Sequence, residues 1–257
     1  MDLRIKGRSA LVLASTSGLG LAVAEGLAGE GARTAFTGRR GDVARKAARN
    51  HPDAIGLELD ITDPDSVRRG LAEAIDALGQ VDIRVLNSGG PPPGTAADLA
   101  AEQMEATLRT LLLAHIDIVS LVLPGMRERK WGRIVAIGSS GVQQPIAGLA
   151  RSNAARAGLA GYLKTLAAEV ASDGVTVNMV LPGRIGTGRV AEIDGNRAKV
   201  TGQDVEAVRA QSISTIPAGR YGTPEEFASA AVFLASDRAS YITGTQVRVD
   251  GGMVAGL

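Results

Sequence analysis

The sequence predicts an α/β protein in which a doubly wound, parallel sheet of about seven strands is covered by helices on both faces. Three observations lead to this prediction. Short apolar runs alternate with longer amphipathic segments along the whole chain, which is typical of strands joined by crossover helices. The runs 11–13 and 134–137 are continuously apolar, as expected for strands buried on both faces. The length of 257 residues, 45% of them hydrophobic, suits a single domain spanning 1–257.

The elements follow one another in a regular order. The short apolar runs are predicted to be strands, and the longer segments with helical periodicity are predicted to be helices. The expected order is strand 9–14, helix 19–30, strand 33–37, helix 42–50, strand 54–59, helix 64–78, strand 83–87, helix 100–129, strand 133–138, helix 152–172, strand 175–181, helix 224–235 and strand 246–249.

Two stretches do not fit this alternation. Residues 89–94 read Gly-Gly-Pro-Pro-Pro-Gly and are predicted to be a loop, because neither helix nor strand interiors tolerate such a sequence. Residues 184–208 form a long connection before the last helix. Long connections are often lids or binding loops, and a disordered surface insertion is the alternative.

Composition excludes several classes of protein. The net charge of +1 gives no reason to expect a nucleic-acid or anionic-membrane partner. The chain has no cysteine, which excludes disulfides and cysteine-based metal sites, and no metal site is predicted. The first residues hold no apolar run of signal-peptide length, and no stretch approaches the roughly 20 uncharged apolar residues of a membrane span. We therefore expect a cytoplasmic protein.

A glycine-containing turn joins the first predicted strand to the first predicted helix. Glycines allow a tight turn and a close approach to a pyrophosphate, and the helix N-terminus offers free N–H groups. The turn therefore predicts a nucleotide site, with a glycine turn that only packs helix on strand as the alternative. The candidate binding residues here are Ser15, Ser17, Gly18, Leu19 and Gly20.

The end of the second predicted strand indicates which dinucleotide is bound. A site for NAD needs a carboxylate here to bind the ribose hydroxyls, and none is present. Arg39 and Arg40 stand there instead, and a guanidinium suits the 2′-phosphate of NADP. NADP(H) is therefore the expected cofactor, with Arg39 the preferred ligand. Two solvated arginines at the start of a helix are the alternative.

Motifs spread along the chain resemble the short-chain dehydrogenase/reductase family, and its 3-oxoacyl-ACP-reductase-like members in particular. Leu13 to Gly20 is similar to the family pattern T-G-x-x-x-G-x-G, with Leu13 and Ala14 in place of the first Thr-Gly. Leu86 to Gly89 resembles N-N-A-G, and Pro182 to Thr187 resembles P-G-x-x-x-T. The resemblance implies a Rossmann-type fold and further cofactor residues: Asp60, Ile61, Asn87, Gly89, Pro182, Gly183, Ile185 and Thr187. Asp60 has a turn or N-cap role as its alternative.

The same resemblance locates the catalytic residues and shows that most of them are replaced. Family members use an asparagine, a serine, a tyrosine thirteen positions after the serine, and a lysine four positions further on. This sequence keeps Ser139 but has Ser152 at the tyrosine position, Arg156 at the lysine position and Leu111 at the asparagine position. Ser152 is too short to reach where a phenol would, and Arg156 cannot cycle a proton because it stays protonated.

Other groups are candidates for the missing proton donor. His115 lies one helical turn after Leu111 and shares its face, although a buried or interface histidine is the alternative. Water held by the three candidate catalytic residues is a second candidate, and Tyr221 beside the long connection is the one tyrosine that we expect to approach. Arg156, with Arg184 and Arg151, suggests a cationic site for an anionic substrate. Pairing of Arg156 with a local carboxylate or the cofactor ribose is the alternative.

Three functions remain open on the sequence alone. The first is an NADP(H)-dependent oxidoreductase acting on a small carbonyl or alcohol with a non-standard proton donor. The second is a catalytically silent NADP(H)-binding protein, such as a sensor or a complex subunit, and the third is a non-redox enzyme acting on an anionic substrate. The family resemblance also implies a homotetramer or homodimer formed through helices 100–129 and 152–172 and the last strand. The apolar residues of those helices fit a monomer core equally well.

Overall fold

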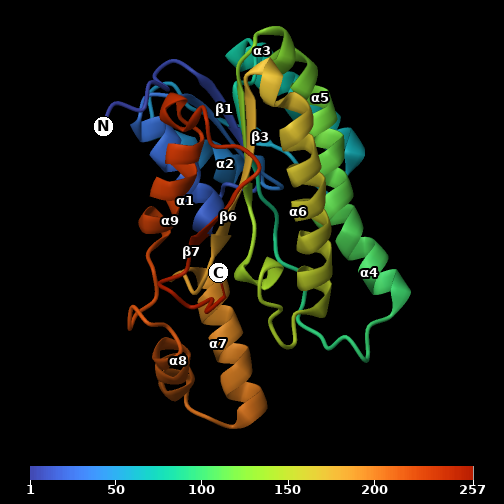
Figure 1. The fold of residues 1–257 in the computed structure, drawn as a ribbon, viewed down its shortest axis with the longest axis vertical. Helices are drawn as coiled ribbons and strands as arrows, with labels where there is room; N and C mark the ends of the chain where they lie inside the picture. The colour runs from blue at the N-terminus through green and yellow to red at the C-terminus, as the bar shows by residue number, and fades with distance from the viewer. Residues whose placement is uncertain (257) are drawn as a thin grey trace.

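The computed structural model describes residues 1–256 and contains one parallel sheet with the strand order β3-β2-β1-β4-β5-β6-β7 (Figure 1). Every neighbouring pair of strands is parallel. The predicted fold class is confirmed. The strands are β1 Ser9–Val12, β2 Arg33–Gly38, β3 Ile55–Glu58, β4 Ile83–Leu86, β5 Gly132–Ile137, β6 Val175–Pro182 and β7 Gln246–Val249.

Helices cover both faces of the sheet, and each face has its own apolar core. Helices α1, α2 and α9 contribute to one core, and α3, α5 and α6 contribute to the other, with successive strand residues alternating between them. The two layers stand on either side of the sheet in Figure 1. The helices are α1 Gly18–Gly29, α2 Gly41–Ala48, α3 Pro64–Leu78, α4 Ala101–Leu108, α5 Ala114–Glu128, α6 Ala150–Val170, α7 Gly188–Thr201, α8 Val205–Ser214 and α9 Pro224–Leu234.

Helices α4 and α5 form one long helix that is interrupted by a π-helical turn at Arg109–Leu113. The combined helix Ala101–Glu128 is the one helix of residues 1–256 that is long and apolar enough to cross a membrane by length and composition. The sequence did not single it out because Arg109 and Asp117 interrupt it with charge; the two form a 3.0 Å ion pair. Its inner residues, including Ile118 and Val119, belong to the core on one face of the sheet.

The connection after β6 is helical, so the alternative of a disordered insertion at 184–208 was wrong, and a lid or binding role for this segment stays a prediction. It holds α7 and the start of α8, which extend beyond the sheet at the bottom of Figure 1. Capping explains both helix starts, since Thr187 accepts the Val190 N–H and Asp204 accepts the Glu206 N–H. The charged, glycine-containing sequence of α7 has little apolar periodicity to reveal it.

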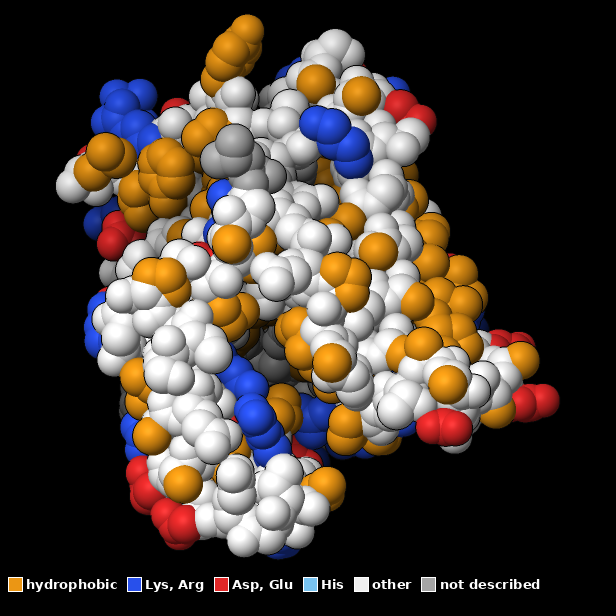
Figure 2. Space-filling model, turned by 60° about the horizontal axis from the view of Figure 1, so that its bottom comes forward, with side chains coloured by type: hydrophobic (Ala, Val, Ile, Leu, Met, Phe, Trp, Pro, Cys, Tyr) orange, Lys and Arg blue, Asp and Glu red, His pale blue; other side chains and the backbone are white. Residues whose placement is uncertain are grey.

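The strand order reverses between β1 and β4. Strands β2 and β3 follow β1 in one direction across the sheet, and β5, β6 and β7 follow β4 in the other. In open α/β sheets, ligands bind in the crevice at the carboxyl ends of the strands at this switch point. The glycine turn after β1, the Asn87 segment after β4 and the Ser139 segment after β5 all begin at this edge. Figure 2 shows a hollow between the α7–α8 segment and the body of the molecule, with Lys or Arg side chains beside it.

Candidate active site

The glycine turn is closed tightly around the switch point. A Cβ atom on Gly20 would lie 2.5 Å from the Ala14 carbonyl oxygen and 2.5 Å from Asn87 Nδ2, so only glycine fits there. Asn87 Nδ2 donates a 3.1 Å hydrogen bond to the Ala14 carbonyl and so connects the turn to the end of β4. The chain thereby brings its backbone close to the space where a pyrophosphate would lie at the start of α1.

Ala14 occupies the left-handed region, with φ +46°. The family pattern has glycine at this position. The sequence alone left open whether the turn would need positive φ there, and the structure shows that it does. A side chain in this conformation is strained by about 1–2 kcal/mol. The turn therefore closes in the same way as a glycine turn, but at an energetic cost.

The side chains of the turn divide into internal and external groups. Ser15 is wholly buried, and its hydroxyl donates to the Val12 carbonyl and accepts the Thr37 N–H at 2.8 Å. Its backbone N–H donates to the Thr37 carbonyl, so neither its hydroxyl nor its amide is free for a ligand, and the expectation that it binds cofactor is corrected. Ser17 is exposed at the N-cap of α1, where its hydroxyl caps no backbone N–H, and Leu19 follows half-buried.

The two arginines after β2 stand free at the surface. Arg39 and Arg40 are both exposed, and within residues 1–256 neither forms an ion pair or a side-chain hydrogen bond. Gly38, the last residue of β2, packs closely against Thr16 of the glycine turn. A Cβ atom on Gly38 would lie only 2.6 Å from the Thr16 methyl group. This contact holds the arginines beside the glycine turn, in a position suited to a ribose phosphate.

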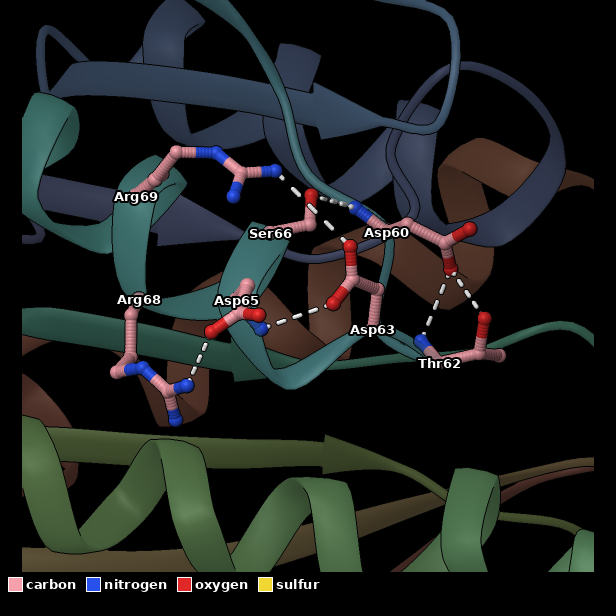
Figure 3. A network of polar contacts seen from close by, with 7 residues as sticks. All are labelled: Asp60, Thr62, Asp63, Asp65, Ser66, Arg68 and Arg69. Carbon is pink, nitrogen blue, oxygen red and sulfur yellow. Dashed lines mark hydrogen bonds and ion pairs between the residues drawn. The ribbon is translucent and has the colours of Figure 1, made fainter.

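The Asp60 side chain accepts hydrogen bonds within its own turn (Figure 3). Its Oδ1 accepts the Thr62 N–H at 2.9 Å and the Thr62 hydroxyl at 2.7 Å, while its own N–H donates to Ser66 Oγ. The N-cap of α3 is Asp63, not Asp60. The Asp60 side chain therefore has the turn role that was the alternative to cofactor binding. Ile61 beside it is half-buried and packs against the core.

The segment after β6 lies against the glycine turn. A Cβ atom on Gly18 would lie 3.9 Å from the Thr187 methyl group, so the two loops face each other across the crevice. Gly183 is fixed by packing, because a Cβ there would lie 2.6 Å from the Asp250 Cα. Pro182 ends β6, and Ile185 is buried in the core with a bridge to Gly222. Gly89 is exposed at the start of the proline loop.

The three candidate catalytic residues lie on two segments that meet at the end of β5, the loop after β5 and helix α6. Arg156 Nη1 donates a 2.8 Å hydrogen bond to the Ile137 carbonyl, which is the last residue of β5. Ser152 lies one turn earlier on the same face of α6, and Ser139 follows Ile137 by two residues. Burial lowers the pKa of Arg156 to about 10, so it remains charged near neutral pH. Ser139 Oγ accepts the Gly141 N–H at 3.1 Å.

Asn153 is a part of this corner that sequence reasoning did not identify. Its Nδ2 donates to the Ile146 carbonyl at 2.9 Å, and a Cβ on Gly141 would lie 2.5 Å from its Oδ1 and 3.2 Å from Ser139 Oγ. Asn153 therefore holds the loop between β5 and α6 beside Ser139. Only the contact across this loop reveals the role, because the sequence gives no spacing signal for it.

The expected cluster of three arginines does not form. Arg184 Nη1 is paired with Asp194 at 2.8 Å, and the Tyr221 hydroxyl donates to the other Asp194 oxygen at 2.8 Å. Arg151 donates to the Pro92 carbonyl in the proline loop. Arg156 and Arg151 each donate to a backbone carbonyl and have no carboxylate partner in the described chain, whereas Arg184 is paired with Asp194. Tyr221 is likewise committed to Asp194 rather than to the catalytic corner.

His115 is not placed to act as an acid. It is only 2% exposed, and burial, followed by the charges of Arg156 and Arg84, lowers its pKa to about 3. The imidazole is therefore neutral at ordinary pH. Leu111 is also buried, at the π-helical turn. Residues 1–256 hold no group of three His, Asp or Glu side chains placed to bind a metal ion.

The fold and this crevice define a dinucleotide-binding protein of Rossmann type. Residues 13–254 match the family described as enoyl-(acyl carrier protein) reductase. The chain is 38% identical over 253 residues to 3-oxoacyl-[acyl-carrier-protein] reductase FabG of Salmonella typhimurium, which covers 96% of this chain and 98% of that protein. The chain thus belongs to the short-chain dehydrogenase/reductase family, as its motifs indicated.

Two solved structures are similar over the whole length. L-sorbose reductase from Gluconobacter frateurii, in complex with NADPH and L-sorbose, is 33% identical with a TM-score of 0.94, and the match covers 100% of both chains. YwfH, described as an NADPH-dependent reductase involved in bacilysin biosynthesis, is 30% identical with a TM-score of 0.91 over 97% of this chain and 99% of YwfH. Both of these solved proteins are described as reductases.

Proposed function

We propose that this protein is an NADP(H)-dependent oxidoreductase of a small carbonyl or alcohol substrate, and that Ser152 and Arg156 replace the family's tyrosine and lysine. Residues 1–257 would act as a single dinucleotide-binding domain. The observation that carries the proposal is the preserved closure of the glycine turn, in which Gly20 leaves no space for a Cβ between the Ala14 carbonyl and Asn87. Such closure is suited to a pyrophosphate at the start of α1.

Three features support NADP(H) rather than NAD(H). Arg39 and Arg40 are exposed and without ionic partners in the described chain, and no carboxylate stands at the end of β2. The sorbose reductase was solved with NADPH, and YwfH is described as NADPH-dependent. Ser17, Gly18, Leu19 and Thr187 would hold the phosphates and the nicotinamide side. When bound, NADPH supplies the hydride for carbonyl reduction.

The residues at the end of β5 would then stabilise charge rather than donate the family's phenolic proton. Ser139 and Ser152 hydroxyls donate hydrogen bonds to the substrate oxygen, and Arg156 stabilises the negative charge that develops on it. Arg156 does not give up its proton, so the proton that completes the alcohol comes from water. Loss of a positioned acid typically costs about 10²–10⁴-fold in rate, which electrostatic stabilisation by a buried guanidinium partly offsets.

An anionic substrate suits this corner. Arg156 is 8% exposed and forms no ion pair within residues 1–256, so its charge is available to a carboxylate. Arg184 cannot share this role because Asp194 neutralises it. The proposal therefore narrows to one arginine, Arg156, whose guanidinium would contact both the carboxylate of a substrate such as a 2-oxo acid and the adjacent carbonyl oxygen that the serines hold.

A silent cofactor-binding protein is the second candidate, and one observation favours it. Leu111, Ser152 and Arg156 stand in place of three of the four residues that the family uses, and neither His115 nor Tyr221 takes their place.

For either function we propose a cytoplasmic homotetramer or homodimer. The outward Leu113 and Leu121 on the long helix, 41% and 47% exposed, would be covered by a second copy.

Oxidation of NADPH over a panel of carbonyl compounds tests the proposal. The panel should pair each 2-oxo acid with its methyl ester, because the pair differs in charge and keeps the ketone. We expect turnover with a higher kcat/KM for the acid than for the methyl ester. Arg156→Ala should lower the ratio of these two kcat/KM values by about 10²-fold. Arg151→Ala is the control, because it removes an arginine of the same helix that donates to the Pro92 carbonyl, and the preference for the acid should remain. Binding of NADPH without oxidation by any member of the panel would favour the silent protein.

A further inference from the structure

Arg84 is a fully buried arginine without a polar partner. It lies on β4, is 0% exposed, and none of its three guanidinium nitrogens has a hydrogen-bond partner in the described chain. Its neighbours Ile83 and Val85 face the core beneath α1 and α9, so alternation directs Arg84 towards the opposite core beneath α3, α5 and α6. Burial lowers its pKa to about 9, and it remains charged at neutral pH.

The neighbouring strand shows how this protein normally accommodates a buried arginine. Arg133 on β5 is 2% exposed, and its nitrogens donate to the carbonyls of Ser236, Gly132 and Gly174. Asp237 lies 3.7 Å from it, and the Trp131 ring lies 4.3 Å from its guanidinium. Arg133 is thus fully compensated. Arg84 has none of these compensations, and a buried charge without partners is strongly destabilising.

Two further buried nitrogen-bearing groups stand on the helices that cover this core, His115 on α5 and Arg156 on α6. Burial lowers the pKa of His115, and the charges of Arg156 and Arg84 lower it further. Its Nδ1 is buried and has no hydrogen-bond partner. Arg156 is buried and donates to one carbonyl only. Within residues 1–256, no carboxylate pairs with Arg84, His115 or Arg156. Two positive charges and an imidazole therefore share a buried region without a negative charge.

We propose that Arg84 and His115 form an internal binding site for a small monovalent anion of halide size, extended by the field of Arg156. Guanidinium nitrogens with free hydrogens, and a neutral imidazole that can carry its proton on Nδ1, are both donors to an anion. An anion bound there supplies hydrogen-bond acceptors and the counter-charge that the protein lacks. The site differs from the substrate corner, because Arg84 pairs with Ile134, three residues or roughly 10 Å before Ile137 on the strand.

Thermal unfolding in chloride and in gluconate at equal ionic strength tests this site. Gluconate is too large for an internal site. We expect the melting temperature to rise with chloride by about 3–5 °C for each tenfold increase above the dissociation constant. Arg84→Met should abolish this rise. It should also be at least as stable as the wild type in gluconate, because it removes an uncompensated charge at similar volume.

Arg133→Met is the matched control, since it removes an equally buried arginine from the adjacent strand. It should lose stability in both salts and keep the chloride response. A crystal grown in bromide should show an anomalous peak beside Arg84 in the wild type and none in Arg84→Met. The absence of a peak, or an equal chloride response in Arg84→Met, would overturn the proposal. An Arg84-dependent rise with acetate but not with chloride would also overturn the halide site.

Discussion

Replacement of Gly20 by alanine tests how the glycine turn is built. The added Cβ would lie 2.5 Å from the Ala14 carbonyl oxygen and 2.5 Å from Asn87 Nδ2, against the roughly 3.4 Å of ordinary contact. Neither atom can move away easily, because the Ala14 oxygen belongs to the backbone and the Asn87 side chain is hydrogen-bonded to that oxygen. Overpacking of this kind costs about 1–3 kcal/mol in the free energy of unfolding. We also expect NADPH affinity to fall by at least tenfold, because the turn must open.

Gly29 offers a control at the other end of the same helix. A Cβ there meets nothing within 4 Å, so Gly29→Ala should be neutral or stabilising by up to about 1 kcal/mol. Urea unfolding followed by the fluorescence of Trp131, the single tryptophan, gives the two free energies. Titration with NADPH gives the affinities. If Gly20→Ala matched Gly29→Ala in both measurements, the steric reasoning would be refuted.

Three further predictions concern single side chains. Ala14→Gly should raise the melting temperature slightly, because relief of about 1–2 kcal/mol of strain exceeds the entropy cost of glycine; a fall would contradict it. Arg39→Ala should weaken NADPH binding about 10–100-fold and leave NADH binding unchanged in parallel titrations. Hydrogen bonds from Arg220 and then the Thr223 N–H lower the pKa of Glu226 to about 2 from 4.5. Its stabilisation is therefore complete above about pH 4.5 and is lost as the pH falls towards 2, so Glu226→Gln should flatten acid unfolding over that window.

The sequence predicted most of the regular structure because strands and helices leave local periodic signals. Helix α3 begins and ends where expected, at Pro64–Leu78, and β7 does the same at Gln246–Val249. Helix α7 was missed because its sequence is charged and contains Gly195, with little apolar periodicity. Its packing depends on a distant pair, Asp194 with Tyr221, which no local pattern encodes.

The site was predictable only where backbone geometry is tied to residue type. Gly18 and Gly20 identified the turn because glycine is needed for its shape. The need for positive φ at Ala14 was not predictable, since alanine rarely adopts it. The pairing of Arg184 with Asp194, and the isolation of Arg84, depend on three-dimensional neighbours. Burial likewise turned His115 from a plausible acid into a neutral group.

The most direct test of the account is NADPH oxidation by the wild type beside the double replacement Ser152→Tyr, Arg156→Lys. The central claim is that Ser139, Ser152 and Arg156 stabilise the substrate oxygen without a phenolic donor. The account predicts that the wild type reduces a carbonyl substrate, and that the double replacement weakens the preference for an anionic one because lysine lacks the bidentate donors of arginine. Activity in the double replacement alone would contradict it, and would show that this fold has kept its cofactor crevice without carbonyl reduction.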